Sequence, residues 1–287
     1  MPSRPFHIVQ PTQRSTSVIF ASPHSGREYP AEFLDRAVLG GSGIRSSEDA
    51  YVDRLIAAAP GYGAPLLLAN VPRAYVDLNR SEQELDPAVI DGARPVSHNP
   101  RIASGLGVIP RVVAGGRAIY RGKISLSEAH ERIVTCWRPY HAQLESLLQE
   151  AHARFGQAIL IDCHSMPHEA VDGVARHGAR RPDVVLGDRF GASASGPVVE
   201  RIEAAFADAG LVTARNSPFA GAYTAQHYGR PVRNQHVVQI EIDRSLYMDE
   251  RKIRPNDDFD SFVEVMERVV ADVALIGAAG DGALAAE

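Results

Sequence analysis

Short runs of apolar residues recur along the chain and stop at polar or turn-forming positions. Each run is five to seven residues long, the length of a buried β-strand rather than of a helix. The predicted strands cover residues 17–22, 65–70, 74–78, 158–163, 183–187 and 236–242. The first run ends at Pro23-His24-Ser25-Gly26, a sequence typical of a tight turn.

Other segments carry apolar residues at the three- and four-residue spacing of one helix face. Helices are expected over about 48–59, ending before Pro60-Gly61, and over 196–209. A C-terminal helix is predicted by one apolar face, which consists of Phe259, Phe262, Met266, Val269, Val273 and Ile276.

The middle of the chain contains a long predicted helix with a marked start and end. Ser125 and Glu128 have the Ser-x-x-Glu spacing of an N-terminal capping box. An apolar stripe follows at helical spacing, and Gly156 ends it. Because proline has no N–H and clashes with the preceding turn, Pro139 is expected to kink or split this helix.

Short buried strands that alternate with helices indicate an α/β protein. Three layers are expected, with a mixed, mostly parallel sheet flanked by helices on both faces. Without an internal repeat or a Gly/Ser linker, residues 1–279 are predicted to form a single catalytic domain, and residues 280–287 a frayed tail. The segment 81–122 is rich in Pro, Gly, Ser and Arg, which is typical of a long functional or disordered loop.

Composition narrows the classes of protein. With 45% hydrophobic and 23% charged residues the chain is ordinary for a globular protein, and a net charge of -5 offers no attraction for nucleic acid. Two cysteines, Cys136 and Cys163, do not make a disulfide framework. Neither a signal-peptide core nor the roughly 18 apolar residues of a membrane span is present. We therefore expect a cytoplasmic protein without a membrane partner.

Polar side chains gather where the predicted strands end. His24 follows the strand 17–22, His164 follows the strand 158–163, the cluster Asp77-Leu78-Asn79-Arg80 ends the strand 74–78, and Glu241 lies near the end of 236–242. In open α/β sheets, sites form just beyond the carboxyl ends of strands. The four groups are therefore expected to converge on one site.

The two histidines are natural metal ligands. Glu48 and Asp49 open a predicted helix and offer a carboxylate, which would complete two histidines and one acid. That set leaves a tetrahedral zinc one position short, as in catalytic zinc sites. Asp162 could orient an imidazole by a hydrogen bond. The alternative is that each histidine only caps a strand.

Glu241 and several arginines have two readings each. A carboxylate inside an apolar strand could be a general base, or it could belong to a buried salt bridge with Arg244 or Arg233. Arg73, Arg80 and Arg230 could bind carboxylates, or they could be structural. Only two of the 30 basic residues are lysines, so no single arginine counts as evidence by itself.

Taken together, the chain resembles the N-formylglutamate amidohydrolase (N-formylglutamate deformylase) family, a distant branch of the zinc carboxypeptidase and aspartoacylase group. Seven segments in one order, spanning about residues 17–250, carry the resemblance. They are SPHSG at 22–26, EDAYVDRL at 48–55, RAYVDLNR at 73–80, DCHSMP at 162–167, LGDRFG at 186–191, HYGRP at 227–231 and QIEIDR at 239–244.

The resemblance implies a metal site of His24, His164 and one carboxylate, with zinc or another divalent ion. Family sequences usually place Asp at the position of Asp49, which favours it over Glu48. The chain departs from the His-x-x-Glu pattern of carboxypeptidases, because His24-Ser25-Gly26-Arg27 has no acid at that spacing. The carboxylate ligand must therefore come from elsewhere in the chain.

The resemblance also implies roles around a small anionic N-acyl amino acid. Glu241 matches the general base, and Arg73 the group that polarises the scissile carbonyl. Residues implied to bind the substrate are Asn79, Arg80, His227 and Arg230.

The expected activity is hydrolysis of N-formyl-L-glutamate to L-glutamate and formate, in histidine catabolism. The alternatives are a metal-dependent deacylase or carboxypeptidase for another N-acyl amino acid or peptide, and a non-catalytic binding protein of the same fold. The oligomeric state is not predicted.

Overall fold

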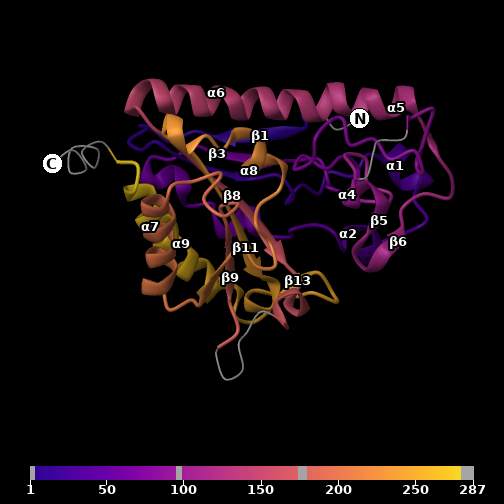
Figure 1. Ribbon diagram of the computed structural model, residues 1–287. Coiled ribbons are helices and arrows are strands. Elements are labelled where there is room, and N and C mark those ends of the chain that lie inside the picture. The colour runs from indigo at the N-terminus through magenta and orange to yellow at the C-terminus, as the bar shows by residue number, and fades with distance from the viewer. Residues whose placement is uncertain (1–3, 95–98, 174–179, 279–287) are drawn as a thin grey trace. The chain divides into compact units, whose positions relative to one another are not determined.

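Five of the six predicted strands, with two short strands that are not predicted (Phe6–Val9 and Thr213–Arg215), form a mixed sheet of seven strands. The computed structural model describes residues 4–94, 99–173 and 180–278. Across the sheet (Figure 1) the strands are β1 (Phe6–Val9), β3 (Leu66–Ala69), β2 (Val18–Ser22), β8 (Ala158–Met166), β11 (Gln235–Asp243), β9 (Val184–Gly187) and β10 (Thr213–Arg215). β2 and β11 are parallel to β8, and β10 is parallel to β9, whereas β9 runs antiparallel to β11. The predicted α/β class with a mixed sheet is confirmed.

The chain divides into two compact units, each built from separated stretches of sequence. Unit 1 consists of Met1–His7, Pro23–Ala50 and Leu68–Leu144, and unit 2 of Ile8–Ser22, Tyr51–Leu67 and Glu145–Glu287. The expectation of a single domain over residues 1–279 stays a prediction. The expected frayed tail at 280–287 lies outside the described residues.

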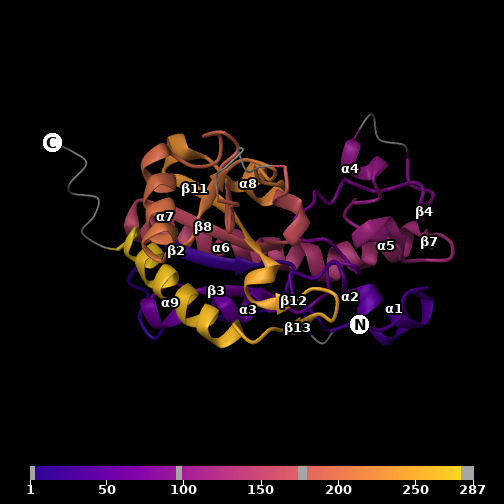
Figure 2. The ribbon, with the colours of Figure 1, turned by 90° about the horizontal axis from the view of Figure 1, so that it is seen from below.

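The helices of unit 2 match the periodic segments of the sequence. α7 (Gly196–Asp208) and α9 (Phe259–Leu275) occupy the predicted ranges, and the apolar face of α9 is buried. α9 packs against α7 and against α3 (Val52–Leu55), as Figure 2 shows. A short helix, α8 (Tyr223–Tyr228), packs on β11.

The helix expected over 48–59 is much shorter than predicted. Only Val52–Leu55 is α-helical, followed by a 3-10 turn at Ala59–Tyr62. Tyr51 has a φ of 68°, in the left-handed region that a right-handed helix excludes. The residues before Tyr51 are therefore not part of the helix, and the conformation of the preceding loop determines the direction of their side chains.

The strand expected over 74–78 is wrong. Tyr75 and Val76 both donate backbone hydrogen bonds to the carbonyl of Pro72, so the chain turns here instead of extending. Pro72 fixes its own φ and has no N–H to offer a neighbouring strand. Residues 74–80 are all buried, because the turn packs within unit 1.

Before the long helix that begins at Leu126, unit 1 is made of short elements, and the described residues of the segment 81–122 form only short ones. The short helices are α1 (Ala31–Arg36), α2 (Ser42–Arg45) and α4 (Pro100–Ala103), with a 3-10 turn at Ala114–Gly116. Two-residue strands pair as β4 (Ile90–Asp91) with β7 (Ile124–Ser125) and β5 (Val112–Val113) with β6 (Arg117–Ala118).

The long helix in the middle of the chain is interrupted near its predicted kink. α5 (Leu126–Arg132) and α6 (Arg138–Phe155) are joined by a π-helical turn at Ile133–Trp137. Pro139 offers no N–H to the carbonyl four residues earlier, and the wider turn lies directly before it. The interruption is thus a change of helical pitch that precedes the proline.

Unit 2 also contains short irregular elements after its main strands. They are 3-10 turns at His168–Val171, Pro231–Arg233 and Arg244–Leu246, and the antiparallel pair β12 (Met248–Asp249) and β13 (Arg254–Pro255). Cys136 and Cys163 are both free and buried, in keeping with core roles. In the described part of the chain, no helix has the length and apolar character needed to cross a membrane.

The start of α5 allows a direct test of the predicted cap. Ser125 Oγ accepts a hydrogen bond from the N–H of Glu128 at 3.1 Å. We expect Ser125→Ala to lower the free energy of unfolding by about 1 kcal/mol, because a helix donor loses its partner. Urea denaturation measures the change. Exposed Ser127 in the same turn is the control, and equal losses in Ser125→Ala and Ser127→Ala would contradict the capping role.

Candidate functional site

Four buried polar side chains occupy one face of two central strands in unit 2. On β8 these are Asp162 and His164, and on β11 they are Gln239 and Glu241. The strands are parallel, with Asp162 opposite Gln239 and His164 opposite Glu241. Register partners on adjacent strands share a face, so the four side chains form one patch.

β8 extends three residues beyond the predicted end. His164 therefore lies inside the strand rather than after it, since pairing with β11 continues to Met166 opposite Asp243. The sequence does not reveal this extension, because the buried strand carries polar side chains here, which are paired with other polar groups, instead of apolar ones.

The patch in unit 2 is ordered by two short contacts. His164 Nε2 lies 3.1 Å from Asp162 Oδ2, which is the orienting role that the sequence suggests for Asp162. Because a carboxylate attracts the protonated ring nitrogen, the other nitrogen, Nδ1, is left with the lone pair in the neutral ring. Gln239 Nε2 donates to Glu241 Oε1 at 2.8 Å.

A second cluster of buried polar groups surrounds His24 in unit 1. His24 Nε2 lies 2.7 Å from Asp77 Oδ1, and His24 Nδ1 lies 3.4 Å from Asp49 Oδ2. Asp49 also donates its N–H to the carbonyl of His24, which ties the two segments together. A Cβ at Gly26 would lie 2.1 Å from the carbonyl oxygen of Val71, so only glycine fits after His24-Ser25.

The contacts of His24 suit a cation. Asp77 fixes the proton of the neutral ring on Nε2, which turns the lone pair of Nδ1 towards Asp49. Two acceptors that face each other in a buried site are stabilised by a positive charge between them, either a proton or a metal ion. His24, Asp49 and His164 are each buried, and each offers one ligand atom.

The structure distinguishes the two neighbouring acids that the sequence leaves open. Glu48 accepts from Arg45, at 2.9 Å from Nη2, and from the Tyr29 hydroxyl at 2.6 Å. Burial, and next the charge of Glu48, raise the pKa of Tyr29, so its hydroxyl stays a donor. Glu48 is therefore engaged in binding protein groups, whereas Asp49 faces the imidazole of His24.

Asp77 is the residue in unit 1 whose importance the sequence understates. It accepts from Arg73 Nε at 2.9 Å and from the N–H of Asn79 at 2.9 Å, besides its contact with His24. Burial would raise the pKa of Asp77, but its interaction with the His24 ring and the charges of Arg73 and Arg80 outweigh it and hold the pKa well below the ordinary value. The signal in the sequence is its spacing, four residues after Arg73.

The predicted substrate-binding arginines differ in their surroundings. Arg80 is buried and donates to the carbonyls of Leu106 and Asn79, within unit 1. In unit 2, Arg230 is exposed and donates to the carbonyls of Gln226 and Gly229. Their assignment to the substrate stays a prediction.

His227, predicted to bind substrate, is exposed on α8. Its ring stacks on Tyr223, with the centroids 4.9 Å apart. Burial and then the charge of Arg230 lower the pKa of His227, which favours the neutral ring. A neutral imidazole can donate or accept a hydrogen bond but contributes no charge to anion binding.

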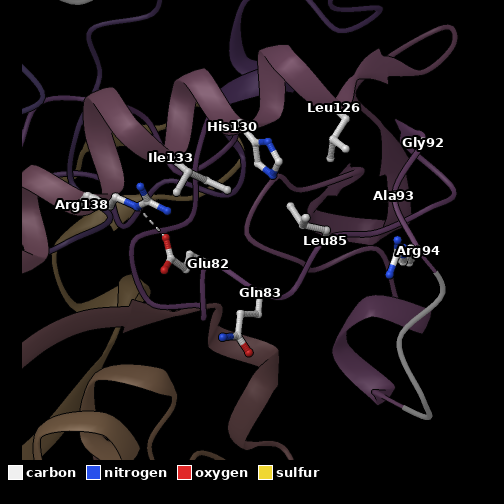
Figure 3. Close-up of a pocket in the computed structure, with 10 residues that line it drawn as sticks. All are labelled: Glu82, Gln83, Leu85, Gly92, Ala93, Arg94, Leu126, His130, Ile133 and Arg138. Carbon is white, nitrogen blue, oxygen red and sulfur yellow. Dashed lines mark hydrogen bonds and ion pairs between the residues drawn. The ribbon is translucent and has the colours of Figure 1, made fainter.

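Figure 3 shows a cavity of about 460 Å³ in unit 1 that contains none of the predicted site residues. Apolar side chains of Leu85, Leu126 and Ile133 line it, and Arg138 at its edge forms an ion pair with Glu82 at 2.8 Å. Its lining lacks the paired histidines and carboxylates described above. The cavity therefore includes neither of the two polar clusters.

Comparison with known proteins gives consistent matches. A model of the N-formylglutamate amidohydrolase family matches residues 16–248. An N-formylglutamate deformylase of Pseudomonas aeruginosa is 32% identical over 244 residues, which cover 82% of this chain and 83% of that protein. An N-formylglutamate deformylase of Pseudomonas putida is 29% identical over 240 residues, covering 81% and 82%.

Solved structures agree with the sequence matches. The crystal structure of N-formylglutamate amidohydrolase from Ralstonia eutropha JMP134 is similar with a TM-score of 0.88 and 34% identity, and the match covers 95% of this chain and 98% of that one. A protein from Agrobacterium tumefaciens has a TM-score of 0.58 at 17% identity, covering 94% and 96%, which shows a shared fold.

Proposed function

The chain belongs to the N-formylglutamate amidohydrolase family and is a hydrolase of amide bonds, and we propose that its substrate is N-formyl-L-glutamate. The products would be L-glutamate and formate. The observation that carries this proposal is the pair of buried polar clusters, each centred on a histidine whose Nε2 is held by a carboxylate. The names of the two Pseudomonas relatives support the choice of substrate.

We further propose that His24, Asp49 and His164 hold one divalent ion, zinc or another. Asp77 and Asp162 place the protons of both imidazoles on Nε2, so that each offers Nδ1 as a ligand. The chain connection supports a shared site. β2 is parallel to β8 with Ala21 opposite Asp162, and His24 follows only three residues after Ala21.

The donor set fits an ion with catalytic properties. Two neutral imidazoles and one carboxylate leave a coordination position open, as in hydrolytic zinc sites. A divalent ion bound there supplies Lewis-acid chemistry, which acidifies water and polarises a carbonyl.

Glu241 is proposed as the general base. One of its oxygens would take a proton from water as the water oxygen adds to the formyl carbon. The same proton would pass to the amide nitrogen as the C–N bond breaks, so that formate and the free amine of glutamate leave. Glu241 is buried beside His164, where a carboxylate is shielded from bulk water.

The remaining polar groups would bind and polarise the substrate. Arg73, oriented by Asp77, would stabilise the charge that develops on the carbonyl oxygen. Guanidinium groups match carboxylates in geometry and charge, which favours Arg80 and Arg230 as partners of the two glutamate carboxylates. Asn79 and His227 would add hydrogen bonds. The proposal includes a cytoplasmic location and a role in histidine catabolism, which the family resemblance implies.

A substrate panel tests the proposed reaction. N-formyl-L-glutamate is expected to have the highest kcat/KM among N-formyl and N-acetyl derivatives of glutamate, aspartate and leucine. A small acyl group and two carboxylates are what the proposed site binds, so the acetyl and leucine compounds should each lose tenfold or more, about 1.4 kcal/mol. A preference for longer acyl groups or for peptides would contradict the proposal, as would tight binding without product.

The paired acids at 48 and 49 test the metal site. Asp49→Asn is expected to lower the affinity for zinc by at least roughly 10–100-fold. Loss of a group that only hydrogen-bonds to a metal ligand already has that effect, and Asp49 is itself a proposed ligand. Glu48→Gln is the matched control, because Glu48 binds the side chains of Arg45 and Tyr29 and is not the proposed metal ligand. Equilibrium dialysis against zinc with metal analysis measures both variants. Equal affinity in the two variants would exclude Asp49 as a ligand.

Glu241→Gln separates catalysis from structure at the proposed base. The variant keeps the size of the side chain and removes the proton acceptor, so kcat should fall by about 10²–10⁴. Metal content and Tm should stay near those of the wild type, because Glu241 is not proposed as a ligand. In a buried salt bridge, by contrast, the variant would lose about 3–5 kcal/mol of stability and keep its turnover when folded.

A further inference from the structure

The proposed base has a neighbour with a defined orientation. Resting on the proposed role of Glu241, we propose that Gln239 is a positioning residue that holds the Glu241 carboxylate in one orientation. Gln239 lies two residues earlier on β11, so both side chains point to the same face of the sheet. Both are buried, and Gln239 Nε2 donates to Glu241 Oε1 at 2.8 Å.

A second hydrogen bond determines which side of the Gln239 amide carries the oxygen and which carries the nitrogen. Its Oε1 accepts a hydrogen bond from the N–H of Ala222 at 2.8 Å. A backbone N–H only donates, so the oxygen of the amide must face Ala222 and the nitrogen must face Glu241. An amide that bridges two fixed groups in this way cannot flip without losing both bonds. The amide nitrogen of Gln239 therefore donates a hydrogen bond to Glu241 and does not take up the proton that Glu241 binds.

The loop that carries Ala222 is itself pressed onto the sheet. Gly187, at the end of β9, lies opposite Gln239 in the antiparallel register. A Cβ at position 187 would lie 2.7 Å from the nitrogen of Gly221 and 2.8 Å from the carbonyl carbon of Ala220. Glycine is therefore required for the close approach, and the loop has no room to move towards β9.

The turn after β9 fastens the same loop from the side. Arg189 donates its N–H to the carbonyl of Ala220 at 2.8 Å, although its φ of 54° is unfavourable for a residue with a side chain. Asn216 Nδ2 donates to Asp188 Oδ1 at 2.5 Å, and Asn216 Oδ1 accepts from the N–H of Asp188. The LGDRFG segment at 186–191 thus holds the support of Gln239 in place.

The hydrogen bond from Gln239 matters for the reaction because the Glu241 side chain has three rotatable bonds and can take many orientations. A carboxylate that must reach a water on one side of the substrate and an amine on the other loses rate when it rotates away. Gln239 binds one oxygen of Glu241 and so restricts rotation of the carboxylate that exchanges the proton. The support runs from β9 through the 216–222 loop to Gln239 and lies wholly within unit 2.

The strand offers a matched pair of glutamines for the experiment. Gln235, at the start of β11, also donates from its Nε2 to a carbonyl, that of Tyr228 at 2.6 Å, and lies six residues before Glu241 on the strand. We expect Gln239→Met to lower kcat for N-formyl-L-glutamate about 10–100-fold with KM within twofold, the scale of a misplaced catalytic group. Gln235→Met should leave kcat within twofold.

Gln239→Glu serves if the methionine variant does not fold. It keeps the acceptor for Ala222, removes the amide donor to Glu241 and places a second carboxylate beside it, so a loss of kcat at least as large is expected. Zinc content, measured on each purified variant, should equal that of the wild type. A normal kcat in Gln239→Glu, or a loss as large in Gln235→Met, would overturn the positioning role.

A double-mutant cycle shows whether Gln239 acts through the base. In the Glu241→Gln background, Gln239→Met should lower the residual kcat by less than twofold, because the group to be positioned is gone. An equal loss in both backgrounds would mean a structural role and would refute the inference. Failure of the proposed function has a different signature, because Glu241→Gln alone would then retain its kcat.

Discussion

The parallel pairing of β8 with β11 is the interaction on which the chemistry of unit 2 depends. All nine residues of each strand are in register, and this places Asp162 and His164 beside Gln239 and Glu241. Burying four polar groups in the middle of a sheet is costly unless each finds a partner. The register supplies those partners, since a slip of one residue would move every side chain to the other face. The opposite face of the same strands is mostly apolar, and its residues Ile159, Ile161, Cys163, Val238, Ile240 and Ile242 are buried in the core.

The two polar clusters follow the same physical rule although they lie in different units. In each, a buried histidine has its Nε2 against a carboxylate, Asp77 for His24 and Asp162 for His164. This arrangement selects one tautomer and directs the same nitrogen, Nδ1, away from the carboxylate. The supporting acid comes from a turn in unit 1 and from the same strand in unit 2. Equivalent chemistry is therefore reached from unrelated local structures.

The errors in the predicted elements have specific causes. An apolar run at 74–78 is read as a strand from its composition, but Pro72 starts a turn and the run is buried by packing instead of pairing. A helix over 48–59 is read from periodicity, but Tyr51 takes a left-handed conformation that local patterns do not show. The helix that Pro139 is expected to kink or split is indeed divided, by a π-helical turn at Ile133–Trp137. At 74–78 and at 48–59 a tertiary requirement outweighs the local preference.

Apolar runs and turn residues in the sequence were enough to locate the central strands, the long helices and the α/β class, because these depend on local periodicity and on burial. The candidate histidines and acids could be named from their places after strands. The preference for Asp49 over Glu48 came from the family resemblance and not from the local pattern, because adjacent residues in a loop can face opposite ways. Arg45 and Tyr29 bind one of them, and His24 faces the other. The roles of Asp77 and Gln239 likewise arise from partners up to 53 residues away, whose hydrogen bonds exist only once the chain has folded.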